Sequence, residues 1–205
     1  MTTRSAPLVG VLAATAEDLC LSFANTRYWR GTEAPTEELR APEDLLRWCG
    51  GTAGVDVATA AARFAADPAA GTAALSAALA LREAFYALFA GAAEDATPAQ
   101  ADVTTLAEML AEAPGRSRLV CGPAGFGWAV PADGSLAALL APVLWSAGDL
   151  LTGRRLARVR RCANPECGWL FLDDSKAATR RWCMMSACGN RAKAKRHYAK
   201  LKAAR

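Results

Sequence analysis

Four cysteines near the end of this 205-residue chain constrain its fold more than any other feature. They follow the spacing Cys-x4-Cys-x15-Cys-x4-Cys, at Cys162, Cys167, Cys183 and Cys188. Two close pairs joined by a longer stretch are a usual arrangement for a tetrahedral zinc site made of four thiolates. Asn164-Pro165, inside the first pair, favours the tight turn that such a pair needs. We therefore predict one Zn²⁺ per chain, with a structural role because four protein ligands leave no position for an activated water.

The spacing alone leaves two other uses of these cysteines open. An iron–sulfur cluster also takes four thiolates, and a pair of thiols can act as a redox switch by forming a disulfide. Residues 1–10 carry one arginine and no long apolar run, so we expect no secretory signal and a cytoplasmic protein. Clustered cysteines in that compartment favour a metal over disulfides. The three scattered cysteines, Cys20, Cys49 and Cys121, are expected to be buried free thiols.

Charge divides the chain just before the cysteines. Residues 154–205 contain 15 lysines and arginines and three acidic residues, a formal charge of +12, whereas residues 1–153 carry a formal charge of −8. A basic segment on an acidic body indicates a polyanion as the partner of that segment. The plainer interpretation is a solvated helix that serves solubility.

The sequence after Cys188 predicts a basic helix that begins beside the metal. No helix breaker follows Gly189, and Ala194, Tyr198 and Leu201 are spaced to face inward. We expect the first amides of this helix, at Asn190 and Arg191, to be available to a phosphate. Trp169, Trp182 and Tyr198 are interpreted as a small core for this segment, with stacking on bases as the alternative. The residues predicted to contact nucleic acid are Arg180, Arg181, Asn190, Arg191, Lys193, Lys195, Arg196 and Lys200.

The predicted fold class is mainly α with a small β component. A helical N-terminal domain is expected at 1–153 and a four-cysteine zinc-finger module, ending in the basic helix, at 154–205. Residues 19–26 are compatible with a strand or a first helical turn, and residues 27–42 with a loop. The remaining elements follow from apolar periodicity, proline and glycine: helices over 42–49, 57–66, 72–93, from Thr97 onward and 135–151, a hairpin over 118–130, and a strand over 168–172.

Around the cysteines, the sequence resembles the CGNR zinc finger. The resemblance rests on the four cysteines, on Phe171-x-Asp173-x-Ser175, on Arg180-Arg-Trp-Cys183 and on Cys188-Gly-Asn-Arg191. Leu19 to Arg30, with Asn25-Thr26 and Trp29-Arg30, resembles the start of the ABATE domain that often precedes this finger. The resemblance implies a bacterial transcription regulator with a role in the stress response.

The favoured function is a regulator that binds double-stranded DNA through the zinc module. Its body would sense a small-molecule effector or form a homodimer, and Asn25, Arg27 and Arg30 are the candidate lining of an effector site. An RNA-binding protein and a protein-interaction module that uses zinc only as a scaffold remain alternatives. We expect no enzyme, because the chain has one histidine, no phosphate-cradling glycine loop and no recognisable pair of carboxylates. No membrane contact is expected, since we identify no apolar run long enough to span a bilayer.

Overall fold

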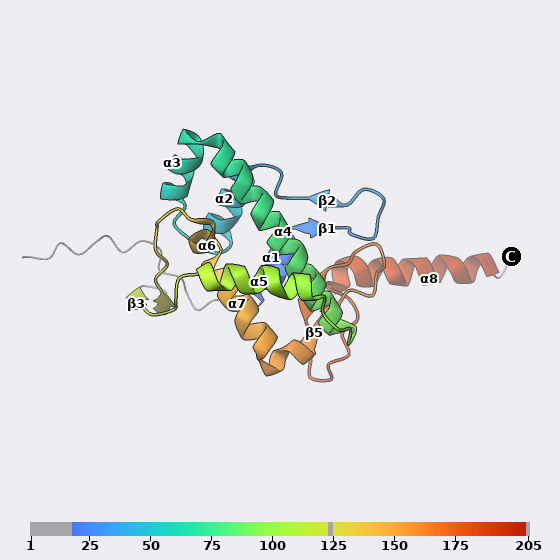
Figure 1. The fold of residues 1–205 in the computed structure, drawn as a ribbon. Coiled ribbons are helices and arrows are strands. Elements are labelled where there is room, and N and C mark those ends of the chain that lie inside the picture. The colour runs from blue at the N-terminus through green and yellow to red at the C-terminus, as the bar shows by residue number, and fades with distance from the viewer. Residues whose placement is uncertain (1–17, 123–124, 204–205) are drawn as a thin grey trace, which may run out of the picture.

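The structure, a computed structural model, describes residues 18–122 and 125–203, and several of its helices pack against one long helix, Pro68–Ala93 (Figure 1). Residues 1–10, where we predicted no secretory signal, lie outside these ranges. The elements of the helical body are α1 Leu19–Ala24, β1 Arg27–Tyr28, β2 Thr36–Glu37, α2 Pro42–Gly51, α3 Ala58–Ala66, α4 Pro68–Ala93, α5 Gln100–Glu112, β3 Leu119–Gly122, β4 Gly125–Trp128, α6 Leu136–Leu139 and α7 Ala141–Thr152. A 3₁₀ turn, Arg154–Arg158, leads to β5 Val159–Arg161, β6 Leu170–Leu172, a π-helical turn Met185–Gly189 and α8 Asn190–Ala203.

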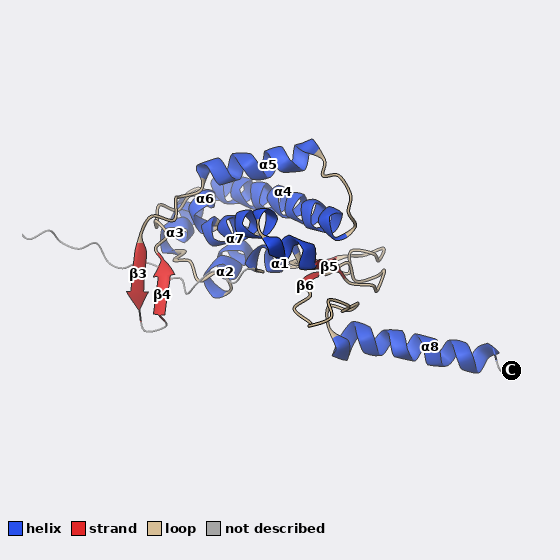
Figure 2. Ribbon diagram, turned by 90° about the horizontal axis from the view of Figure 1, so that it is seen from below, coloured by secondary structure: helices blue, strands red, loops and turns tan. Residues whose placement is uncertain are grey.

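We call residues 18–152 the helical body and residues 158–189 the cysteine module. Helices account for 56% of the residues and strands for 9%, which confirms the mainly α class. Each of the sheets is a single antiparallel pair, β1 with β2, β3 with β4, and β5 with β6. The β3–β4 hairpin lies at one end of the body, and α8 extends away from the opposite end (Figure 2).

The central helix α4 begins at a strong start signal. Pro68 occupies its first turn, and the Asp67 carboxylate accepts hydrogen bonds from the Ala69 and Ala70 amides, both at 3.1 Å. The prediction from Thr72 therefore started one turn late. By length and hydropathy α4 could cross a membrane, so the prediction that no run is long enough was wrong. In this fold, however, α4 packs against α1, α2, α3 and α5 as a core helix.

Three other predicted elements need correction. The predicted loop 27–42 contains the two-residue strands β1 and β2, because Glu37 and Thr36 pair with Arg27 and Tyr28. The helix expected from Thr97 begins at Gln100. Ser135 does cap a helix, accepting from the Ala138 amide at 3.1 Å, but the segment divides into α6 and α7 at Leu140, two residues before Pro142. Of residues 19–26, left open between strand and helix, Leu19–Ala24 form α1.

The strand β6 separates two hydrophobic clusters. Side chains alternate across a strand, so Leu170 and Leu172 join the core of the helical body, while Phe171 packs with the cysteines in a second, smaller cluster. Val159 of β5 also belongs to the body's core. The β5–β6 pair of the cysteine module thus contributes to the core of the helices, while the cysteines form a small core of their own.

Candidate metal centre and basic helix

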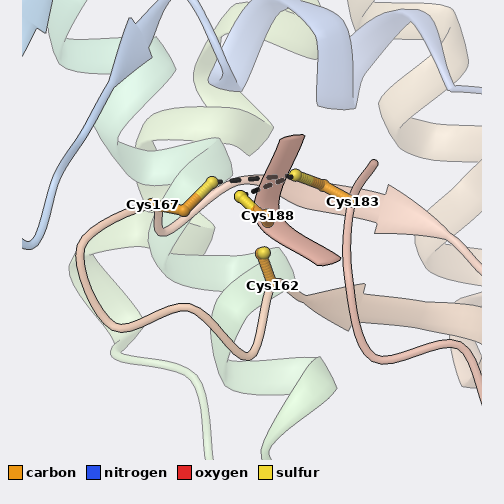
Figure 3. Close-up of side chains that lie close together, drawn as sticks. All are labelled: Cys162, Cys167, Cys183 and Cys188. Atoms are coloured by element: carbon orange, nitrogen blue, oxygen red, sulfur yellow. Dashed lines mark hydrogen bonds between the residues drawn. The ribbon is translucent and has the colours of Figure 1, made fainter. Parts of the chain in front are cut away.

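The four cysteines converge on one point. Their sulfur atoms all lie within 4.8 Å of one another, and Cys162, Cys167 and Cys188 are buried (Figure 3). The Cys183 sulfur lies 3.7 Å from that of Cys167 and 3.8 Å from that of Cys188. Thiolates 2.3 Å from a tetrahedral zinc ion would be about 3.8 Å apart, far longer than a disulfide bond of about 2 Å. The cluster therefore fits one metal ion.

Backbone hydrogen bonds hold each cysteine pair in a turn. In the first pair, the Cys167 amide donates to the Asn164 carbonyl at 2.9 Å, and the Asn164 side chain donates to the Cys188 sulfur at 3.6 Å. In the second pair, the Gly189 amide donates to the Met184 carbonyl at 3.1 Å. Hydrogen bonds to a ligating sulfur orient it and stabilise its thiolate. The Asn164-Pro165 turn predicted from sequence is present and connects the two pairs.

A buried aspartate organises the loop between the pairs. Asp173 accepts hydrogen bonds from the Ser175 hydroxyl at 2.5 Å, the Ser175 amide at 3.0 Å and the Arg180 amide at 2.8 Å. These bonds, that of the Ser175 hydroxyl foremost, hold the pKa of Asp173 below its usual range. The Arg180 guanidinium stacks on Phe171 at 4.5 Å and donates to the carbonyls of Trp182 and Cys183. Arg180 therefore braces the turn that carries Cys183.

The thiols of the cluster perturb one another's ionisation. The hydrogen bond from Cys183 stabilises the Cys167 thiolate and lowers the pKa of Cys167 to about 5. The same contact raises the pKa of Cys183, and burial raises the pKa of Cys188. Neighbouring thiolates repel each other in a buried place. A bound dication would offset that repulsion and allow the thiols to lose their protons.

One short segment of the helical body, residues 25–31, forms several hydrogen bonds with the cysteine module. The Asn25 side chain exchanges hydrogen bonds with the Leu170 backbone at 2.8 and 2.9 Å. The amides of Arg30 and Gly31 donate to the carbonyls of Cys167 and Glu166 at 3.4 and 3.3 Å. These bonds fix the position of the module on the body.

The backbones of the helical body and the cysteine module approach each other closely at Gly31 and Pro165. A Cβ on Gly31 would lie 1.8 Å from the Pro165 carbonyl oxygen, so no larger residue fits without a shift. Gly168 adopts φ +68°, where glycine is favoured, and its carbonyl accepts a hydrogen bond from the Tyr86 hydroxyl at 2.8 Å. Trp29 also has a positive φ, 57°, which is rare for a bulky residue, and it packs against the cysteine cluster.

An ion-pair network that the sequence did not reveal supports this segment. Arg82, 2% exposed on α4, forms two hydrogen bonds with Glu37, at 2.5 and 2.7 Å, and an ion pair with Glu83 at 2.9 Å. Glu83 also accepts two hydrogen bonds from Arg30, whose guanidinium stacks on Tyr86 at 3.8 Å. Arg82 falls on the apolar stripe of its helix, so the helical periodicity predicts only a core position for it.

The structure separates the predicted effector residues. Arg27 and Arg30 line a cleft of about 780 Å³ between the body and the cysteine module. Asn25 does not line the cleft, because its side chain is hydrogen-bonded to the Leu170 backbone. The three residues therefore do not form one lining.

Some predicted nucleic-acid residues do come together. Arg181, Arg191, Lys195 and Arg196 line a cavity of about 320 Å³ beside Trp182 and Cys188. Arg191 stacks over Trp29 at 4.4 Å, and Lys195 forms an ion pair with Glu166 at 3.1 Å. Lys193 and Asn190 are exposed on α8 outside this cavity. The side chain of Lys200 lies outside the described residues.

The structure corrects four expectations about this half of the chain. The Asn190 amide donates to the Met185 and Ala187 carbonyls, because α8 continues the π-helical turn, so it is not available to a phosphate. Ala194 and Leu201 are exposed, since α8 extends beyond the body; the Tyr198 side chain lies outside the described residues. Trp169 is 38% exposed and does not join the small core, whereas Trp182 does. Cys121 is exposed on the β3–β4 hairpin, although Cys20 and Cys49 are buried as predicted.

Comparison with known families matches both halves of the chain. The family model ABATE, described as "Putative stress-induced transcription regulator", matches residues 17–154. The CGNR zinc finger matches residues 158–200, which include all four cysteines and most of α8. No protein with a curated description matches the chain. Neither matching family is an enzyme family.

Proposed function

Because this chain belongs to the ABATE family and carries a CGNR zinc finger after that domain, we propose that it regulates transcription by binding double-stranded DNA. Cys162, Cys167, Cys183 and Cys188 would hold one structural Zn²⁺. The ion would supply no reaction, since four thiolates complete its tetrahedral coordination. Its effect would be to fix the direction in which α8 leaves the cysteine module.

One observation carries the DNA proposal. Every basic side chain that the structure describes on α8 is exposed, and the helix extends clear of the acidic body (Figure 2). A basic helix of this kind can approach the DNA backbone without the body colliding with it, and its lysines and arginines would neutralise phosphates. Arg181 beside the metal site extends the same positive surface. We assign the phosphate contacts to Arg181, Arg191, Lys193, Lys195, Arg196 and Lys200.

Two predicted contacts receive different roles. Arg180 is engaged with Phe171 and with two carbonyls of the turn, so its proposed role is to position the metal site. Asn190 donates from its side chain to the Ser186 carbonyl at 3.1 Å but remains exposed. It stays a candidate for reading base edges, together with Arg191.

Single-stranded nucleic acid, RNA above all, is the second candidate. A small apolar cavity of about 260 Å³ beside the cysteines is lined by Tyr28, Trp29 and Trp169. The Tyr28 and Trp169 rings lie 6.3 Å apart, and Trp169 is partly exposed. Exposed aromatic rings next to a basic surface suit the stacking of unpaired bases.

A cytoplasmic location, a homodimer and a role in stress also stay predictions.

A salt series distinguishes these proposals. The zinc-loaded protein is titrated into labelled duplex DNA, single-stranded DNA and RNA between low and moderate salt. Duplex binding is expected to be tightest, with a slope of about −4 to −6 in log affinity against log salt. The Lys193→Gln/Arg196→Gln double variant should reduce that slope by about 2. Arg63→Gln, on the exposed face of α3, is the matched control.

Two results would contradict the DNA proposal. If single strands bind more tightly than the duplex and Trp169→Ala abolishes the preference, the RNA proposal replaces the DNA proposal. If the folded, zinc-loaded protein shows no salt-dependent binding to any of the three, the module serves protein interaction instead.

A further inference from the structure

We propose that the cleft between the helical body and the cysteine module binds a small anion carrying carboxylate or phosphate groups, and that the anion bridges the two walls. The cleft encloses about 780 Å³, within the range of about 300–1,000 Å³ typical of small-molecule sites. This site is separate from α8 and does not depend on the proposed binding of DNA.

Both parts of the chain contribute to the cleft. Arg27 and Arg30, after α1, and Glu83 and Tyr86, on α4, belong to the body wall. Arg160 and Arg161, at the end of β5, and the turn from Cys162 to Pro165 belong to the module wall. A ligand held by both walls would therefore touch the elements that position the metal site.

The charges of the walls favour an anion. Four arginines and two glutamates line the cleft. Glu94 forms an ion pair with Arg161 at 2.5 Å, and Glu83 is shared by Arg30 and Arg82. Both carboxylates are thus already neutralised by protein groups, and the positive charge of the other arginines remains.

One arginine on each wall has hydrogen-bond donors that no carboxylate in the described ranges accepts. On the body wall, Arg27 is 41% exposed and reaches Glu83 only at 3.8 Å, longer than a hydrogen bond. On the module wall, Arg160 donates from Nη1 to the carbonyls of Ala157 and Val159. Among the described residues, no carboxylate forms an ion pair with Arg160, although its charge acts on Asp173 at longer range. Planar guanidinium groups match carboxylate and phosphate oxygens in bidentate geometry.

A buried donor in the same wall lacks an acceptor. Arg30 Nε forms no hydrogen bond in the part of the chain that the structure describes, although its Nη atoms contact Glu83 and the Ala24 carbonyl. Buried donors without partners are rare and costly, and they cluster at functional places. Arg30 lines the cleft and its amide donates to the Cys167 carbonyl, so the donor without a partner belongs to the wall that the anion would contact.

Isothermal titration calorimetry on the full, zinc-loaded chain tests the proposal without DNA. The probes are inorganic phosphate, glycerol 3-phosphate and succinate, at constant ionic strength in a chloride buffer. At least one probe is expected to bind with a stoichiometry of one and a Kd below about 5 mM. Arg27→Gln and Arg160→Gln, one from each wall, should each weaken binding about tenfold, as loss of about 1.4 kcal/mol implies.

Matched variants separate this cleft from the basic helix. Arg181→Gln/Lys195→Gln and Arg63→Gln should leave the affinity unchanged, and Arg160→Lys, which keeps the charge without the fork, should lose less than Arg160→Gln. If none of the probes binds with a Kd below about 5 mM, or if only one wall's variant weakens binding, the bridging site is wrong. It is equally wrong if the α8 pair abolishes binding while both cleft variants retain it. Circular dichroism of each variant confirms that it is folded before titration.

Discussion

Asn25 and Leu170 exchange two hydrogen bonds, from Asn25 Nδ2 to the Leu170 carbonyl at 2.8 Å and from the Leu170 amide to Asn25 Oδ1 at 2.9 Å. The asparagine side chain thus pairs with β6 as a neighbouring strand would. Asn25 is 6% exposed and Leu170 is 1% exposed, so water cannot replace these partners. The contact joins the two halves of the chain across 145 residues.

Replacing Asn25 with leucine should destabilise the protein strongly. Asn25→Leu keeps a similar volume but leaves the Leu170 amide and carbonyl buried without partners, at about 1–3 kcal/mol each. We expect a loss of about 2–4 kcal/mol in the free energy of unfolding, measured by urea denaturation of the zinc-loaded chain. Asn190→Leu, on exposed α8, is the control and should change stability by less than about 0.5 kcal/mol. A loss of similar size in both variants would contradict the special role of Asn25.

Gly31 should tolerate no side chain. In Gly31→Ala the new Cβ meets the Pro165 carbonyl 1.8 Å away, so the cysteine module must move or the turn must distort. Overpacking of this kind costs about 1–3 kcal/mol, and zinc should leave faster when a chelator is added. Gly51→Ala is the matched control, since nothing lies within 4 Å of a Cβ there. Equal stability and equal zinc-release rates in the two variants would show that the contact is loose.

The sequence predicts local features of this chain well and contacts between its halves poorly. The spacing of the cysteines predicts that the four side chains come together, because one metal ion requires all four sulfurs around it. The helices from Pro42 and Val57 and the hairpin over 118–130 follow from local turn and periodicity signals. The outcome at Ser135 shows the limit: its cap was predicted, but the break at Leu140 was not.

Residues 25–31 show why the remainder could not be predicted. Asn25 and Arg30 look like polar residues free to bind an effector, yet their partners, Leu170 and Glu83, lie 145 and 53 positions away in the chain. No periodicity encodes such pairings. The partner of Arg82 could not be predicted for the same reason, since its ion pair with Glu37 depends on how α4 and β2 are placed relative to each other.

Stability should fall in acid through the Glu37–Arg82 pair. Burial disfavours the charged form of Glu37, but hydrogen bonds from Arg82 and from the Leu39 amide outweigh it and hold the pKa of Glu37 below its usual value. A lowered pKa in the folded state means that the stabilisation is present above the unfolded pKa, near 4.5. It is lost as pH falls through the folded pKa. Glu37→Gln should therefore cost about 2 kcal/mol at pH 7 and progressively less toward pH 3.

Urea titrations of the wild type and Glu37→Gln at matched pH values measure this difference. Glu43→Gln, which carries the same change at an exposed position of α2, should show a small difference at every pH. A Glu37→Gln penalty that is constant from pH 7 to pH 3 would mean that the carboxylate charge contributes nothing.

Cys183→Ser should lose the metal while Cys121→Ser keeps it. Cys183 lies 3.7 and 3.8 Å from two other sulfurs of the cluster, whereas Cys121 is exposed on the distant β3–β4 hairpin. Metal analysis should find one zinc per chain in the wild type and in Cys121→Ser. Both proteins should be colourless, whereas an iron–sulfur cluster would absorb visible light. Because Phe171 and Trp182 pack on the cysteines, Cys183→Ser should also lose the near-ultraviolet signal of the module. The far-ultraviolet helical signal should fall much less, because most helices belong to the body's separate core. A full equivalent of zinc in Cys183→Ser would remove Cys183 from the ligands and require a different fourth group.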